Sequence, residues 1–167
     1  MLDYPAESEE REMVRRWGKV TSQPKLEARS NAAELMALRE EVDRVHVSEL
    51  IESYLLKLVR ATRDRVVSAA PAKGTILKRG AATKPMLAYG ASPRASLSLY
   101  QAGKALAWLR GLDYVTADLI QEIYPDVMRH RVGLSYEAEA DGVTEDQILR
   151  GVLDRTPVPS TAEATRT

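Results

Sequence analysis

Apolar residues recur at steps of three and four along most of the chain, which is the spacing of one face of an α-helix. The clearest stripe begins just after residue 90 and consists of Ala95, Leu99, Ala102, Leu106 and Leu109. Further stripes and boundary residues predict helices over residues 5–18, 30–45, 48–64, 116–125 and 144–153. We therefore predict an all-α fold, a helical bundle of about six helices.

Residues that start and stop helices support these boundaries. Ser48 and Thr116 stand where an N-cap is expected, and Thr144 with Gln147 has the spacing of a capping box. Pro125 is expected to break the helix that starts at Thr116, because proline lacks the N–H that an inner helical turn requires.

The predicted helices over 30–45 and 48–64 are separated by only a short stretch of chain. This spacing predicts an antiparallel pair of helices joined by a very short turn. His46 lies in that turn, and we expect it to be a hydrogen-bonded turn residue rather than a catalytic base.

Residues 65–90 interrupt the helical pattern with repeated proline and glycine. A long loop is predicted here, in which the short apolar runs 65–67 and 75–77 could pair as a small β-hairpin. The chain is thus expected to contain a first helix, a linker, a helical domain with an insertion at 65–90, and a disordered tail, over residues 1–18, 19–29, 30–155 and 156–167.

Charge is balanced overall but unevenly placed. The chain has 24 basic and 24 acidic residues and a formal net charge of zero, which argues against a whole-domain electrostatic partner such as DNA. Between Asp64 and Asp113, however, there is no acidic residue, while eight lysines and arginines fall there. This basic block is either a solvated loop or a surface that faces an anion, and the sequence leaves both interpretations open.

Composition excludes several classes of site. With no cysteine, the 167-residue chain has neither disulfides nor thiolate metal sites, and its two histidines are too few for a histidine-rich metal site. No apolar run approaches the roughly 20 residues that cross a bilayer, and the first residues lack the apolar region of a signal peptide. We expect a protein without a membrane span, located in the cytoplasm.

Arg94 is the residue of the sequence that most clearly suggests a binding site. It follows Ser92, a candidate N-cap, and Pro93, which suits the first helical position, so Arg94 falls in the first turn of the predicted helix. A cation there is repelled by the positive end of the helix dipole and is unfavourable for the helix itself. An anion bound at the same place would make the arrangement favourable. The alternative is a surface arginine that pairs with a carboxylate or with water.

Two other polar clusters have simpler interpretations. The run of Arg129, His130 and Arg131 is expected to complement the negative end of a helix rather than to bind phosphate. The acidic series of Glu137, Glu139 and Asp141 is expected to be a solvated loop rather than a calcium or magnesium site. The sequence contains no phosphate loop, no strand ending in magnesium-holding acids, no serine elbow and no zinc-binding helix motif.

The segment Gly90-Ala91-Ser92-Pro93-Arg94-Ala95-Ser96 resembles the sensor-2 segment of MoxR-type AAA+ ATPases. Neighbouring stretches are similar to the lid of the same family, in the same order, over residues 45–48, 59–63, 113–116, 125–131 and 134–140. The opening Asp3-Tyr4-Pro5 resembles the exit from the ATPase core, so the resemblance covers about residues 2–155.

The resemblance implies a C-terminal helical lid, with residues 1–18 as the helix that connects it to the core. It implies that Arg94 reaches the γ-phosphate of ATP, with Ser92 and Pro93 setting the helix start. ATP and Mg²⁺ would be held only through a core domain that this chain lacks, so the chain is not expected to be catalytic alone. The stretch between Thr62 and Gly90 is longer than the family link and is interpreted as an insertion.

The resemblance also implies a ring oligomer in which the lid contacts its core domain and neighbouring subunits. Its role would be chaperone-like remodelling or insertion of a metal or cofactor, with von Willebrand-type domain proteins as partners. Two alternatives remain from the sequence. The chain could be a free-standing helical protein-interaction module, or a nucleic-acid binder that uses the basic segment 65–112.

Overall fold

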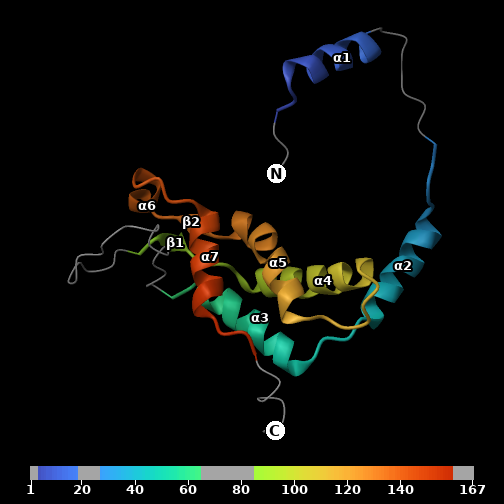
Figure 1. Ribbon diagram of the computed structural model, residues 1–167. Coiled ribbons are helices and arrows are strands. Elements are labelled where there is room, and N and C mark those ends of the chain that lie inside the picture. The colour runs from blue at the N-terminus through green and yellow to red at the C-terminus, as the bar shows by residue number, and fades with distance from the viewer. Residues whose placement is uncertain (1–3, 19–26, 65–84, 160–167) are drawn as a thin grey trace. The chain divides into compact units, whose positions relative to one another are not determined.

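The computed structural model describes residues 4–18, 27–64 and 85–159 (Figure 1). The chain divides into two compact units, residues 1–36 and 37–167, and the boundary falls inside helix α2 (Ala32–Arg44). The predicted hairpin runs at 65–67 and 75–77 lie outside the described residues, as do most of the predicted linker and tail.

The first unit contains helix α1 (Glu7–Trp17), which confirms the helix predicted at the start of the chain. Its first turn is acidic and its last turn basic, which suits the helix dipole. The Glu9 carboxylate accepts a hydrogen bond from the Ala6 N–H at 2.8 Å and so caps the helix start. The apolar side chains of Met13, Val14 and Trp17 remain about half exposed or more.

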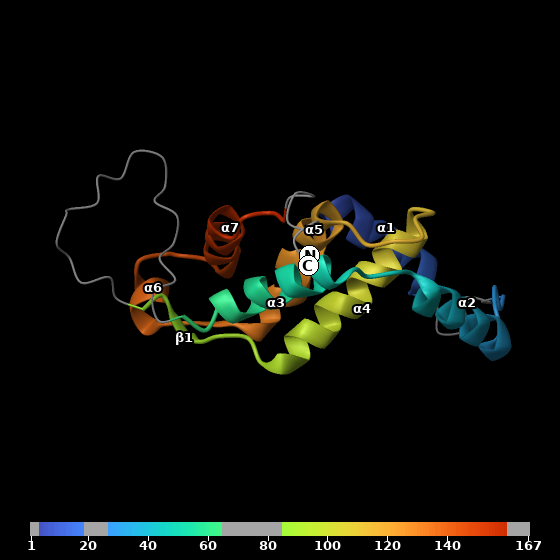
Figure 2. The same cartoon turned by 90° about the horizontal axis from the view of Figure 1, so that it is seen from below.

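The second unit is mostly helical, which confirms the predicted fold class. After α2 it contains α3 (Glu49–Ala61), β1 (Leu87–Tyr89), α4 (Pro93–Leu109), α5 (Ala117–Met128), the 3-10 helix η1 (Arg129–Arg131), β2 (Gly133–Leu134), α6 (Tyr136–Ala140) and α7 (Glu145–Arg155). Figure 2 shows α3 running alongside α4. Helix α5 packs against α4 and also contacts α3 and α7.

The core forms where the apolar stripes of α3, α4, α5 and α7 meet. Leu58, Leu99, Ile120 and Ile148, one from each helix, are completely buried. Burying a side chain of this size stabilises the fold by roughly 1.5–3 kcal/mol. Gly103 lets the Ile120 side chain of α5 lie against α4, because a Cβ atom at position 103 would lie 2.8 Å from Ile120 Cδ1.

Two buried tyrosines link α3 to α5. The Tyr124 hydroxyl donates to the Leu58 carbonyl at 3.2 Å, and the Tyr54 hydroxyl accepts from Gln121 Nε2 at 2.9 Å. Burial raises the pKa of Tyr124, and the nearby Tyr54 adds to the shift. The Tyr124 phenol is therefore a neutral hydrogen-bonding group of the core.

The side-chain caps predicted for the starts of α3, α5 and α7 are confirmed. Ser48 Oγ accepts from the Ile51 N–H and Thr116 Oγ1 accepts from the Leu119 N–H. Thr144 and Gln147 form a reciprocal capping box at the start of α7, with distances of 3.0 and 3.3 Å.

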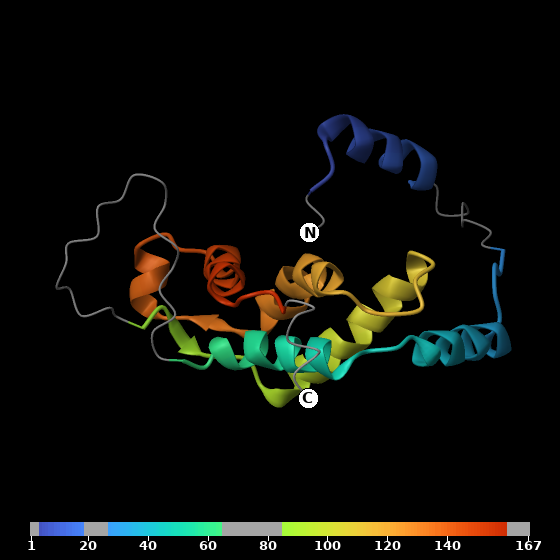
Figure 3. The same cartoon turned by 60° about the horizontal axis from the view of Figure 1, so that its bottom comes forward.

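The predicted antiparallel pairing of the second and third helices is wrong. Helix α3 packs mainly against α4, whereas the last turn of α2 is tied to α4 (Figure 3). Lys104 Nζ donates to the Asp43 carbonyl at 2.5 Å, and Trp108 Nε1 donates to Glu41 at 3.0 Å. The segment between α2 and α3 is extended rather than a tight turn, because the His46 backbone pairs with the segment that precedes α5.

Pro125 does not break α5, which continues through it to Met128. Proline inside a helix costs about 3 kcal/mol or more. Tyr124 and Met128, on either side of it, are fully buried, and their burial offsets a cost of this size. Tertiary packing therefore overrides the local stop signal.

The two strands form a small antiparallel sheet between distant segments. Leu87 pairs with Leu134 and Tyr89 with Gly133. A side chain at Gly133 would overlap the Tyr89 ring, so this glycine lets the ring lie against the strand. The sheet holds the segment that enters α4 against the segment that follows η1.

Candidate functional site

The start of α4 lies where the sequence predicts it, with Ser92 as N-cap and Pro93 as the first helical residue. The Ala95 N–H donates to the Ser92 carbonyl at 2.9 Å and closes the first turn. The Ser92 side chain makes no capping hydrogen bond within the described residues. N–H groups at this helix end are therefore left without a side-chain cap.

Arg94 is exposed in this first turn. Among the described residues it has no hydrogen-bond or ion-pair partner, so the alternative of a carboxylate-paired surface arginine finds no support in this part of the chain. The first turn of α4 contains no acidic residue, unlike those of the other described α-helices. The positive charge of the guanidinium and the partial positive charge of the helix end thus add to one another, and the summed potential favours binding of an anion.

The loop that leads into α4 is fastened to the end of α3. Thr62 Oγ1 accepts from the Ala91 N–H at 3.0 Å, and Arg63 Nε donates to the Ala91 carbonyl at 2.8 Å. Ala91 is buried, and Gly90 before it lies against the backbone of Thr62. No short-range pattern in the sequence singles out Thr62 or Arg63 as a site residue, because their contacts with Ala91 span 29 and 28 residues of chain.

The cluster at Arg129–Arg131 is engaged in structural contacts. Arg129 binds both carboxylate oxygens of Asp146, at 2.7 and 3.1 Å, and lowers the pKa of that carboxyl. Arg131 donates to the Val127 carbonyl at 3.0 Å and to Ser98 Oγ at 3.0 Å. Arg131 therefore fulfils the predicted role at a helix end, while Arg129 ties α7 to the end of α5.

The acidic series lies on a short helix rather than in the expected loop. Ser135 caps α6 by accepting from the Ala138 N–H at 3.2 Å, and Glu137 and Glu139 are exposed on it. Across the described residues, no group of three or more His, Cys, Asp or Glu side chains is placed to hold a metal ion. The same residues include no helix long and apolar enough to cross a membrane.

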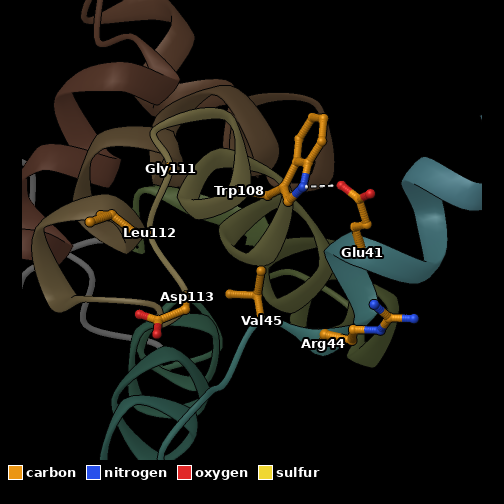
Figure 4. Close-up of a pocket in the computed structure, with 7 residues that line it drawn as sticks. All are labelled: Glu41, Arg44, Val45, Trp108, Gly111, Leu112 and Asp113. Carbon is orange, nitrogen blue, oxygen red and sulfur yellow. Dashed lines mark hydrogen bonds between the residues drawn. The ribbon is translucent and has the colours of Figure 1, made fainter.

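A pocket of about 290 Å³ lies between the end of α2 and the end of α4 (Figure 4). The Trp108 indole points toward Glu41 across its rim, and the two are hydrogen-bonded. This pocket is about 21 Å along α4 from Arg94, at 1.5 Å per residue. It is therefore separate from the start of α4.

Basic residues elsewhere in the described part of the 65–112 segment are already paired. Lys104 binds the Asp43 carbonyl, and Arg110 forms an ion pair with Glu122 at 2.5 Å. Of the basic side chains described in this segment, only Arg94 is left for a ligand. The other five basic residues of this segment lie outside the described residues, namely Arg65, Lys73, Lys78, Arg79 and Lys84. The nucleic-acid interpretation, which needs several cations along one surface, therefore stays a prediction.

Comparison with known proteins agrees with the lid interpretation. A family model described as the AAA lid domain matches residues 79–152. Chaperone MoxR1 of Mycobacterium tuberculosis is 34% identical over 158 residues, which are 95% of this chain and 39% of that protein. Protein MoxR of Methylorubrum extorquens is 32% identical over 111 residues, which cover 65% of this chain and 30% of that protein.

A solved structure shares the fold. The crystal structure of a candidate ATPase from Cytophaga hutchinsonii aligns with a TM-score of 0.73 and 30% sequence identity, covering 95% of this chain and 45% of that one. The chain thus spans less than half the length of these relatives. The family model, the MoxR relatives and the shared fold together show that this chain contains the lid domain of a MoxR-type AAA+ ATPase.

Proposed function

We propose that this lid domain contributes to ATP binding and hydrolysis in a MoxR-like AAA+ ATPase, with Arg94 as its sensor-2 residue. The observation that carries the proposal is the exposed guanidinium in an acid-free first turn of α4, without a partner among the described residues. A guanidinium fork matches two phosphate oxygens, and the helix end adds a favourable field.

The residues present fit one part of a nucleotide, its terminal phosphate. Arg94 would stabilise the negative charge that develops on the γ-phosphate during hydrolysis, while Pro93 and Ser92 set the direction of the helix start. The phosphate loop and the magnesium-binding acids belong to a core domain. The lid is therefore not catalytic alone in this proposal.

The lid would also couple the nucleotide state to the rest of the assembly. In the proposed ring, a lid that closes over ATP moves as a rigid body against its core domain and the neighbouring subunit. The name of the relative Chaperone MoxR1 supports a chaperone-like role. The proposed outcome of that role is remodelling of partner proteins, or insertion of a metal or cofactor into them. Von Willebrand-type domain proteins are the proposed partners, and the cytoplasm the proposed location.

Helix α1 offers a surface for the core domain. Met13, Val14 and Trp17 are exposed by 51%, 63% and 47%, so this helix leaves its apolar residues uncovered within the described part of the chain. We assign the core domain as the partner that covers them, because α1 precedes the lid and would connect the two. A protein-interaction module without ATPase function would also use this surface, and ATP turnover separates the two.

The test uses the assembled ATPase, in which this chain acts with its AAA+ core. Arg94→Ala should lower ATP turnover about 10- to 100-fold, since one hydrogen-bonded charge contact contributes about 1.5–3 kcal/mol. Arg94→Lys keeps the charge but not the fork and should recover only part of the activity. Arg150→Ala, at an exposed position on α7, is the matched control. Turnover of Arg94→Ala within about a factor of two of the parent would refute the sensor-2 role.

A further inference from the structure

We propose that Thr62 is a positioning residue for Arg94, which its hydroxyl places by fixing the backbone that enters α4. The inference rests on the sensor-2 function proposed above and adds to it a residue at the far end of another helix. Thr62 follows α3 directly as its C-cap, 32 residues before Arg94 in the sequence.

The Thr62 hydroxyl is used twice. It donates to the Val59 carbonyl at 2.7 Å, in the last turn of α3, and it accepts from the Ala91 N–H at 3.0 Å. Thr62 is 1% exposed and is one of two buried polar side chains among the described residues. A hydroxyl in this position orients Ala91 relative to α3, because its proton and its lone pair each have a fixed partner.

The other polar group of the Ala91 backbone is also held. Arg63 Nε donates to the Ala91 carbonyl at 2.8 Å. Both hydrogen-bonding groups of one residue are thus bound to two consecutive residues at the end of α3. The peptide groups on the two sides of Ala91 are therefore fixed in position and in direction.

Gly90 brings the two backbones into direct contact. A Cβ atom at this position would lie 2.7 Å from the Thr62 carbonyl carbon and 2.9 Å from Arg63 Cα. Real Cβ atoms essentially never come so close to backbone atoms. The contact therefore requires glycine at position 90, and it places Ala91 within hydrogen-bonding distance of the Thr62 hydroxyl.

Arg94 lies between two fixed points of the chain. Ala91 is held by the end of α3, and Ala95 is completely buried in the core. Pro93, between them, has its φ angle fixed by its ring. The Cα atom of Arg94 is therefore set by the end of α3, and a displacement of about 1 Å at a catalytic group is enough to slow a reaction strongly.

The experiment is a double-mutant cycle in the assembled ATPase, with Thr62→Val, Arg94→Ala and the double variant. Valine keeps the shape of threonine but can neither donate nor accept. Thr62→Val should lower ATP turnover about five- to tenfold, as expected for the loss of one buried hydrogen bond. The double variant should be no slower than Arg94→Ala alone, because Thr62 acts through Arg94.

Two further measurements separate positioning from general stability. Thr62→Ser retains the hydroxyl and should restore most of the turnover. Thr62→Val should also weaken binding of a non-hydrolysable ATP analogue more than binding of ADP, because only the analogue has a γ-phosphate. If Thr62→Val does not fold, Arg63→Met removes the other hydrogen bond that holds Ala91, from an exposed position. It should likewise weaken binding of the analogue more than binding of ADP.

The outcomes distinguish the two proposals. If Arg94→Ala slows turnover but Thr62→Val slows it equally in the presence and absence of Arg94, the positioning role is wrong and the sensor-2 role stands. Equal losses in Thr62→Val and Thr62→Ser, or equal losses of ATP analogue and ADP, likewise overturn the positioning role. If Arg94→Ala has no effect, both proposals fail.

Discussion

Gly90 provides a sharp test of how the start of α4 is built. It has no positive φ angle, so it is required for space rather than for backbone freedom. In Gly90→Ala, the new methyl group meets the Thr62 carbonyl group and Arg63 Cα, all of them backbone atoms that cannot rotate away. The loop must move, which strains the two hydrogen bonds that hold Ala91.

The magnitude follows from these contacts. Overpacking of this kind costs about 1–3 kcal/mol, and each weakened hydrogen bond adds about 0.5–1.5 kcal/mol. With two such hydrogen bonds, Gly90→Ala should therefore lower the free energy of unfolding by about 2–6 kcal/mol. Urea denaturation of this chain, followed by circular dichroism of its helices, measures the change, and an unchanged slope against urea shows that compactness is the same.

Gly103→Ala is the matched comparison. Its methyl group would meet Ile120 Cδ1, the far end of a flexible side chain, at 2.8 Å. Alanine also has a helix propensity about 1 kcal/mol better than that of glycine, so the net loss should be small. The reasoning is refuted if Gly103→Ala destabilises the chain as much as Gly90→Ala does.

Further predictions concern the core and the helix ends. Tyr124→Phe should cost about 1 kcal/mol in urea denaturation, because it leaves the buried Leu58 carbonyl without its donor. Thr144→Ala should cost about 1 kcal/mol by removing the N-cap of α7, and Thr144→Ser should restore it. Arg129 lowers the pKa of Asp146, so their contact contributes above the ordinary carboxyl range and is lost as the pH falls below about 4. Since both side chains are more than a third exposed, Asp146→Asn should lower stability at pH 7 by under about 1 kcal/mol and by less at pH 2; an equal loss at both pH values would contradict this.

The helix starts could be predicted from the sequence because their causes are local. Ser48, Thr116 and Thr144 each act within three residues of themselves, and Pro93 fixes its own φ angle. The same local reasoning predicts Arg94 in the first turn of α4, which is where it lies.

The incorrect predictions arise where contacts between distant segments of the chain determine the structure. Pro125 is a helix stop in isolation, but burial of its neighbours keeps α5 continuous. The extended segment around His46 pairs with residues near Tyr114, which no short-range pattern reveals. Threonine is usually found at the protein surface, so the sequence gives no reason to expect Thr62 to be buried. Only its contact with Ala91 makes it part of the candidate site.

The contact between Thr62 and Ala91 has a consequence for the stretch of chain between them. The contact joins the two ends of that stretch, so these ends lie together whatever the length of chain between them. Lengthening a loop whose ends are joined costs only about 0.6 kcal/mol for each doubling of length. A lid built in this way tolerates insertions and deletions there without moving Arg94, so that this segment can diverge or accept a grafted sequence while the geometry of α4 is retained.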